Sequence, residues 1–263
     1  MKHSFLDQYS NRDSIIHRLD PRSKLLVALA FIATIALMPV SSWLVYGMYF
    51  IIIATLILLS RVPPLFVFRR SLVIIPFVLL VAVFIPFFKE GELAFVFDIW
   101  RWHLSVTHNG LELLWSILAK SWLSILSLIL LTSTTGFASL LKGLERLRMP
   151  RVMVMLLSFM YRYIFLLTDE TMRMKQARNS RNFGSGRLRQ ISTVGNMIGT
   201  LFIRSYERGE RIYAAMVSRG FDGHSRTLDR LRFNRTDIYF ITSMMLILGI
   251  INLFNLFYKG ELL

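Results

Sequence analysis

The sequence contains no cysteine and few charged residues. Without cysteine, the chain can form neither a disulfide framework nor a thiolate metal site. Charged residues make up 18% of its 263 residues, whereas soluble domains carry about a quarter. The apolar fraction is 54%. This excess of apolar residues requires a solvent other than water, and the composition therefore predicts a membrane protein.

The motifs of common catalytic sites are also missing. No Gly-x-x-x-x-Gly-Lys-Ser/Thr phosphate loop occurs, so the chain is not expected to hydrolyse ATP. Neither His-Glu-x-x-His nor Gly-x-Ser-x-Gly occurs, and the five histidines are scattered. Asp169 and Glu170 are adjacent, so they point apart on a helix, which favours solvation or pairing with arginine over acid–base catalysis. We expect no catalytic residue, no metal and no cofactor in this chain.

Long apolar stretches predict five membrane-spanning helices. Residues 25–59 are almost entirely apolar, but one helix of that length would measure about 50 Å against a hydrocarbon core of about 30 Å. The stretch Pro39–Ser42 divides them into two spans. The five predicted spans are residues 24–39, 43–60, 71–88 (with kinks at Pro76 and Pro86), 111–135 and 238–258.

Charge indicates the orientation of these spans. Residues 136–235 contain 19 Lys and Arg against 7 Asp and Glu, a net charge of +12 within a total of +15. Short basic loops favour the cytoplasmic side, so the N-terminus, a basic loop at 61–70 and residues 136–235 are placed inside. The turn at 39–42, a loop at 89–110 and the C-terminal tail are then outside. The apolar stretch 150–168 has basic flanks on both sides and is predicted to be cytoplasmic or interfacial.

The predicted fold is therefore all-α and polytopic. It comprises a cytoplasmic N-terminal segment at 1–23, a four-helix membrane part at 24–135, a cytoplasmic helical domain at 136–235, and the last span with a short external tail at 236–263. Lys120 lies within the fourth span. An ionisable residue there is a functional candidate, although snorkelling or a helix–helix contact would also explain it.

The basic segment contains three predicted helices, at about 137–148, 150–181 and 190–219. In the third, helical spacing places Arg204, Arg208, Arg211 and Arg219 on one face. The opposite face carries apolar and aromatic residues: Phe202, Tyr206, Tyr213 and Val217. The arginine row is either the solvated side of an amphipathic helix or a surface for an acidic partner.

Two of these helices end in a similar tripeptide. Ser218-Arg219-Gly220 ends the third helix, and glycine readily takes the left-handed cap conformation. Ser180-Arg181-Asn182 ends the second helix, and asparagine is the next best residue for that cap. An arginine that projects from a capped helix end can bind a carboxylate bidentately. Two such ends suggest two equivalent contacts, which would suit two similar ATPase subunits.

Several blocks of the chain resemble the T component, the transmembrane coupling protein, of energy-coupling-factor transporters, and most closely its cobalt-type CbiQ family. The resemblance covers nearly the whole chain. The similar blocks are Leu19-Asp20-Pro21-Arg22-Ser23-Lys24-Leu25-Leu26, Leu131-Thr132-Ser133-Thr134-Thr135, Leu140-Leu141, Leu144 to Pro150, Tyr161-Arg162-Tyr163, Asp169-Glu170, Arg204-Ser205-Tyr206-Glu207-Arg208 and, most specifically, Ala214 to Gly223.

The resemblance implies a role for these residues. Such proteins join a substrate-binding membrane subunit to a pair of ABC ATPases, and two coupling helices with Ala-Arg-Gly-like ends dock into the ATPases. Carried over, ATPase docking falls to Ser180, Arg181, Asn182, Ser218, Arg219, Gly220, Arg178 and Arg211. Arg178 is the alternative to Arg181, since Ser180-Arg181-Asn182 departs from the motif at both outer positions. Contact with the substrate subunit falls to Leu140, Leu141, Leu144, Leu147, Met153 and Leu156.

The implied function is divalent cobalt uptake across the cell (inner or plasma) membrane. ATP and Mg are then bound by the two ATPases, and a cobalt-type substrate subunit, a small accessory membrane subunit and membrane lipid are the other expected partners. The same role in a nickel or vitamin importer stays open. Two other classes are a membrane-anchored enzyme and a binder of nucleic acid or anionic lipid through the basic segment. Few aromatic residues interleave the basic face, which argues against nucleic acid.

Overall fold

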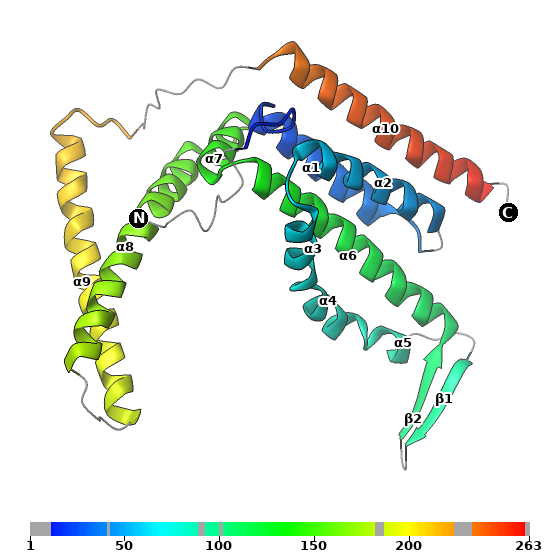
Figure 1. Ribbon diagram of the computed structural model, residues 1–263, viewed down its shortest axis with the longest axis horizontal. Helices are drawn as coiled ribbons and strands as arrows, with labels where there is room; N and C mark the ends of the chain where they lie inside the picture. Colours follow the sequence, from blue (N-terminus) through cyan, green and yellow to red (C-terminus); the bar gives the residue numbers. More distant parts are fainter. Residues whose placement is uncertain are drawn as a thin grey trace. The chain divides into compact units, whose positions relative to one another are not determined.

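The computed structural model describes residues 12–40, 43–88, 93–99, 102–181, 187–223 and 233–260 (Figure 1). The chain divides into two units. We call Ser4–Gly143 with Leu231–Leu263 the bundle unit, and Leu144–Arg230 the helix-pair unit. The sequence analysis placed boundaries at 23/24, 135/136 and 235/236, and its division into four segments stays a prediction.

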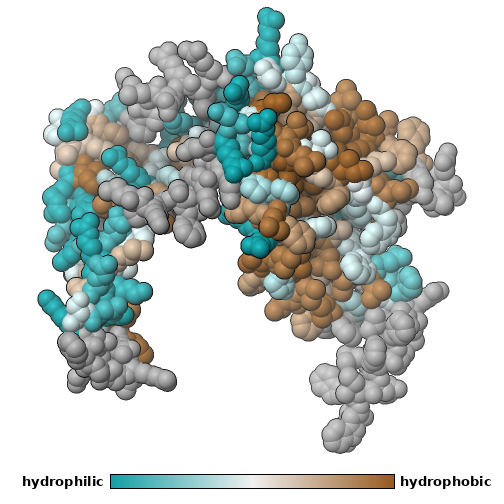
Figure 2. Space-filling view, in the orientation of Figure 1, coloured by the Kyte–Doolittle hydropathy of each residue, from teal (hydrophilic) through white to brown (hydrophobic). Residues whose placement is uncertain are grey.

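The bundle unit is built from apolar helices around a common core. Its helices are α1 Pro21–Leu37, α2 Trp43–Ser60, α3 Pro64–Leu72, α4 Ile75–Ala82, α5 Ile85–Phe88, α6 His108–Thr134 and α10 Arg235–Gly260, and most of α7 Phe137–Arg146 also belongs to it. α1 packs against α6 and α10, and α2 packs against α6. Phe31, Ile35, Tyr49 and Ile53 lie in the core between them. The outward residues are also apolar, as expected for a surface that faces lipid (Figure 2).

Five helices of the described residues are long and apolar enough to cross a membrane: Trp43–Ser60, Pro64–Ala82, His108–Thr134, Arg151–Arg181 and Arg235–Phe257. The predicted number was also five, but the set differs. α1 has 17 residues, one fewer than the shortest of these, yet several of its residues lie in the bundle core. The helix at 151–181 was predicted not to cross. These helices make the chain a multi-pass membrane protein.

The third predicted span begins earlier than expected. Residues 61–70 were predicted to be a basic loop, but α3 starts at Pro64 and includes Arg69 and Arg70 in its last turn. Proline is well suited to the first helical position, and cations are favoured near a helix C-terminus. Pro76 and Pro86 each lie in the first turn of a new short helix, α4 and α5, where the missing N–H costs no hydrogen bond.

The predicted loop at 89–110 contains a β-hairpin, so this part of the prediction was wrong. β1 Leu93–Ile99 pairs antiparallel with β2 Trp102–Thr107, in a register from Leu93↔Thr107 to Ile99↔Trp102. Aromatic and β-branched residues dominate both strands and have high β-propensity. The all-α class is confirmed for the rest of the fold, and this hairpin is an addition to it.

The helix-pair unit consists mainly of α8 Arg151–Arg181 and α9 Arg187–Val217. Each helix has 31 residues, which corresponds to about 46 Å. α9 runs antiparallel to α8 and packs against it (Figure 1). Hydrophilic residues cover much of this unit's surface (Figure 2). The predicted helices at 150–181 and 190–219 agree with α8 and α9 to within three residues, whereas the helix at 137–148 ends two residues earlier, at Arg146.

Candidate functional site

The C-terminal end of α9 has the predicted cap. Gly220 adopts φ +79°, its N–H donates to the Val217 carbonyl at 2.9 Å, and the Phe221 N–H donates to the Met216 carbonyl at 3.0 Å. These two bonds form a Schellman motif. Arg219 is the residue just before the left-handed glycine, and its side chain is exposed. The cap thus fixes the backbone from which this arginine projects.

The C-terminal end of α8 carries the second tripeptide. Ser180 Oγ donates to the Gln176 carbonyl at 3.1 Å, on the helix itself. Arg178 donates through Nη2 and Nε to Asn179 Oδ1 at 3.2 and 3.4 Å. Arg181 is exposed and has no hydrogen-bond or ion-pair partner among the described residues. Asn182 lies outside the described residues, so its predicted capping role stays a prediction.

Arg181 and Arg219 lie at opposite ends of the helix pair. Because α8 and α9 are antiparallel, their C-termini are separated by about the length of one helix, on the order of 45 Å. Both arginines are exposed, and each lies beside a helix C-terminus whose partial negative charge favours a cation. Such an arrangement would allow each arginine to contact a separate partner.

The predicted arginine row on α9 divides into two sets. Arg204 forms an ion pair with Glu170 of α8, and Arg208 lines a cavity between α8 and α9. Arg211 is exposed and forms a weak pair with Glu207 at 3.8 Å. The expectation of one outward cationic face was therefore wrong for Arg204 and Arg208, because these two residues face α8. The pairing of Glu170 with an arginine is one of the two roles that the sequence left open for it.

The side of α9 that was predicted to be apolar is not covered by the described part of the chain. Its residues Phe202, Tyr206, Tyr213 and Val217 are all exposed. On α8, Met153 and Leu156 are exposed as well, together with Val152 and Met160. A large apolar surface of this kind is typical of an interaction site with a protein or a membrane.

The residues predicted to contact a substrate subunit differ in exposure. Leu140, Leu144 and Leu147 are partly buried, whereas Met153 and Leu156 are exposed. Leu141 is only 2% exposed. Its predicted contact with a partner stays a prediction, and the burial of its side chain within the chain argues against it. The sequence pattern could not separate Leu141 from its neighbours, since every leucine in α7 is equally apolar.

A buried polar cluster in the bundle unit was missed by the sequence analysis. Asp237, in the first turn of α10, is 3% exposed. Its Oδ1 accepts the Asp20 N–H at 2.7 Å and the Ser23 hydroxyl at 3.2 Å, both from the start of α1. Its Oδ2 accepts the Asn234 N–H at 2.8 Å. The spacing Asn234-x-x-Asp237 resembles half of a capping box, and this local pattern could have indicated the role of Asp237 at the start of α10.

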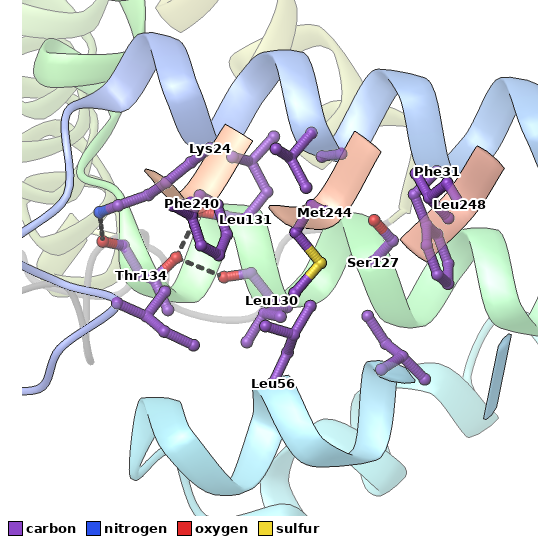
Figure 3. Close-up of a pocket in the computed structure, with 14 residues that line it drawn as sticks. Lys24, Phe31, Leu56, Ser127, Leu130, Leu131, Thr134, Phe240, Met244 and Leu248 are labelled. Carbon is purple, nitrogen blue, oxygen red and sulfur yellow. Dashed lines mark hydrogen bonds between the residues drawn. The ribbon is translucent and has the colours of Figure 1, made fainter. Parts of the chain in front are cut away.

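Lys24 extends this cluster to α6. Its Nζ donates to the Thr134 carbonyl at 3.0 Å (Figure 3). It also donates to the His17 carbonyl at 3.1 Å. It lies at the edge of a small cavity of about 40 Å³ whose walls are mostly apolar, including Phe31, Leu56 and Met244. The described residues contain no group of three or more His, Asp or Glu that could hold a metal ion. The cluster therefore joins the ends of α1, α6 and α10.

Comparisons with known proteins identify the family of the chain. Residues 12–228 match the model of the CbiQ family, described as a cobalt transport protein. The chain belongs to the CbiQ family. It is 31% identical over 264 residues to the energy-coupling factor transporter transmembrane protein EcfT of Listeria innocua, covering 95% of this chain and 98% of that protein. EcfT of Lactococcus lactis is 30% identical over 259 residues, with 94% and 96% covered.

A fused cobalt transport protein, CbiMQ, of Methanocorpusculum labreanum is 36% identical over 128 residues, which are 48% of this chain and 21% of that protein. Family membership gives the chain a role in membrane transport as a non-catalytic transmembrane component. The names of these relatives imply an assembly with partner subunits.

Proposed function

We propose that this CbiQ family member is the energy-coupling membrane subunit of an importer, which joins two ABC ATPases to a substrate-binding membrane subunit. One observation carries the proposal. Arg181 and Arg219 are exposed at opposite ends of two antiparallel helices of 31 residues each. A pair of ATPases presents two similar acidic sites at a distance from each other, and one arginine would enter each site.

The docking sites are the two helix ends with their flanking residues. Arg219 with Ser218 and Gly220 forms one site, and Arg181 with Ser180 and Asn182 forms the other. Arg181 has no partner within the part of the chain that the structure describes, which supports its choice over Arg178, which donates to Asn179. Arg211 lies two turns before Arg219 and pairs only weakly with Glu207, so it is available to add to the second site.

The helix pair would transmit motion from the ATPases. Binding of ATP and Mg by the ATPases closes them, and closure changes the distance between the two docking sites. Because each helix is continuous over its 31 residues, displacement of its end moves the whole helix. The ion pair between Glu170 and Arg204 lies about midway along the pair and would act as the pivot.

The substrate subunit would bind the apolar surface of the coupling helices. Met153 and Leu156 are exposed on α8. Leu140 and Leu144 of α7, and Leu147 just after it, are partly exposed. Movement of α8 would then reorient the substrate subunit and release its cargo. This chain binds no metal or nucleotide in this scheme, and a small accessory membrane subunit completes the complex.

The proposed orientation places the N-terminus and the helix-pair unit in the cytoplasm. α8 is long and apolar enough to cross a membrane, but its start is flanked by Arg148 and Arg151, and its second half carries Arg173 and Lys175. Basic residues on both sides favour the same, cytoplasmic side. α8 would therefore lie along the inner membrane surface, with its apolar side toward lipid or the substrate subunit.

Cobalt is the proposed cargo, because the family is described as a cobalt transport protein and CbiMQ shares 36% identity with half of this chain. The same role in a nickel or vitamin importer is the second candidate. The nearly full-length similarity to two EcfT proteins, whose names specify no cargo, is compatible with it. The choice of cargo would rest with the substrate subunit, which co-purification with this chain would identify.

Co-purification also tests the coupling role. Arg181→Ala and Arg219→Ala should each weaken ATPase docking by about 2–5 kcal/mol, as expected when one member of a buried charge pair is lost. Arg173→Ala is the matched control, because Arg173 is exposed on α8 and belongs to neither docking site. Recovery of both ATPases at the unsubstituted yield with the double variant Arg181→Ala/Arg219→Ala would contradict the proposal.

A further inference from the structure

The cavity between α8 and α9 is separate from both docking sites. It has a volume of about 230 Å³, which exceeds the roughly 150 Å³ of an apolar cavity that accommodates benzene. Leu166 and Leu167 of α8 and Leu201 and Ile212 of α9 form its apolar walls. Leu166 remains 37% exposed, so the cavity is a cleft that a ligand can enter from outside the pair.

The polar side of the cleft carries an excess of positive charge. Arg204 and Glu170 neutralise each other in an ion pair. Arg208 makes no ion pair within the described residues, and it is one of the residues that line the cleft. Tyr163 and Ser205 also line the cleft. Arginine binds phosphate bidentately through its planar fork, so this side of the cleft is suited to an anionic headgroup.

A glycine leaves one wall of the cleft open. Gly209 lines it, and a Cβ at this position would meet no atom within 4 Å. A glycine inside a helix costs roughly 1 kcal/mol relative to alanine, and here the missing side chain keeps the cleft accessible.

We propose that this cleft binds the phosphate headgroup and adjoining acyl segment of an anionic phospholipid. The inference rests on the proposed function, which lays α8 along the inner membrane surface. Basic pockets between transmembrane helices on the cytoplasmic side bind lipid headgroups, and the cleft beside α8 would offer a similar pocket at that surface. Arg208 holds the phosphate, and Leu166, Leu167, Leu201 and Ile212 contact the chain. The bound lipid fills the space between α8 and α9, and so sets how freely the two helices move past each other.

The test uses the full-length chain in nanodiscs, with Tyr163→Trp as a fluorescent reporter in the cleft. Quenching by brominated phosphatidylglycerol is compared with quenching by brominated phosphatidylcholine, and the signal of the chain without the reporter is subtracted because five other tryptophans are present. Phosphatidylglycerol should quench the reporter selectively. Inorganic phosphate at about 10 mM should not relieve this quenching, because salt at that concentration weakens contacts between exposed charges but should not displace a lipid held in the cleft.

Two pairs of variants separate the cleft from the general surface. Arg208→Gln should lower the selective quenching about tenfold or more, as expected for loss of a charge-assisted bond. Arg162→Gln removes the same charge from an exposed position next to the reporter and should leave the selective quenching unchanged. Gly209→Leu should block the cleft. Gly199→Leu is the control and should not block it, because Gly199 does not line the cleft although a Cβ there, as at Gly209, would meet no atom within 4 Å.

Three results would overturn the proposal. The first is equal quenching by the two lipids, and the second is an equal loss of selective quenching in Arg208→Gln and Arg162→Gln. The third is displacement of the lipid by inorganic phosphate or by the bound ATPases, which would assign the cleft to a soluble anion or a protein. Co-purification of the ATPases is measured on the same variants. Loss of lipid selectivity with normal co-purification rejects the lipid site alone, whereas absent co-purification in the unsubstituted chain rejects the proposed function.

Discussion

Lys24 Nζ donates to the carbonyl of Thr134 at 3.0 Å, where α6 ends. Its counterpart is Lys120 of α6, which donates to the carbonyls of Ala36 and Met38 at the end of α1. Each of the two antiparallel helices thus supplies a lysine to the C-terminus of the other. Helix C-termini leave carbonyls unpaired and carry partial negative charge, and in a bilayer no water is present to satisfy them.

The two lysines should differ in their effect on stability. Lys24→Met should destabilise the chain by about 1–3 kcal/mol, because it leaves buried carbonyls without a donor. Lys120→Met should cost less, since the Lys120 side chain is only partly buried. Unfolding in a detergent titration series would measure both. A larger loss of stability in Lys120→Met than in Lys24→Met would contradict this prediction, because the more buried lysine would then contribute less to stability.

Asp237→Ala should destabilise the bundle by about 2–4 kcal/mol, because the Asp20 N–H and the Ser23 hydroxyl would lose a buried acceptor. Asp237→Asn keeps one acceptor oxygen and should lose less. The order of the thermal midpoints checks this, and equal midpoints for the two variants would mean that the hydrogen bonds to Asp20 and Ser23 contribute little.

Gly110→Ala should destabilise the start of α6 by about 1–3 kcal/mol through overpacking. A Cβ at this position would lie 2.7 Å from the Pro86 Cα, a backbone atom that cannot move away cheaply. Gly47→Ala in α2 is the control, because its Cβ would meet nothing within 4 Å. Thermal unfolding of the two variants should shift in opposite directions or by clearly different amounts, and equal shifts would argue against close packing at Pro86.

Arg148→Gly should stabilise the end of α7 by about 1 kcal/mol. Arg148 has φ +72° in the position that glycine usually occupies after a helix. The Met149 N–H donates to the Leu144 carbonyl at 3.2 Å across this cap, so hydrogen exchange at the Met149 amide should become slower in the glycine variant. Arg148→Ala keeps the strained φ and should give no such gain. A similar slowing in Arg148→Ala would show that the side chain, and not the backbone, limits this cap.

Local signals in the sequence predicted the ends of the coupling helices well. The left-handed cap at Gly220 and the end of α8 near Arg181 follow from residue types within one turn. α3 was missed because Arg69 and Arg70 indicated a loop, although Pro63-Pro64 marks a helix start. The hairpin was missed because its aromatic residues also fit a membrane interface.

Long-range contacts could not be derived from the sequence. Asp237 and Asp20 are 217 positions apart, and nothing local to either residue indicates the other. The inward direction of Arg208 depends on which side of α9 packs against α8. Periodicity defines the sides of a helix but does not say which side meets a neighbour. The burial of Leu141 likewise depends on which side of α7 meets a neighbour, and the sequence does not give that side.

The absence of cysteine permits a direct test of the central claim. Ser180→Cys and Ser218→Cys place a single thiol beside each docking arginine, in an otherwise thiol-free chain. Cross-linking in native membranes should join each position to an ATPase, and the double variant should yield one chain joined to two ATPases. Labelling of either thiol from the outer side of the membrane, or a double variant that never captures more than one ATPase, would contradict the proposed coupling role.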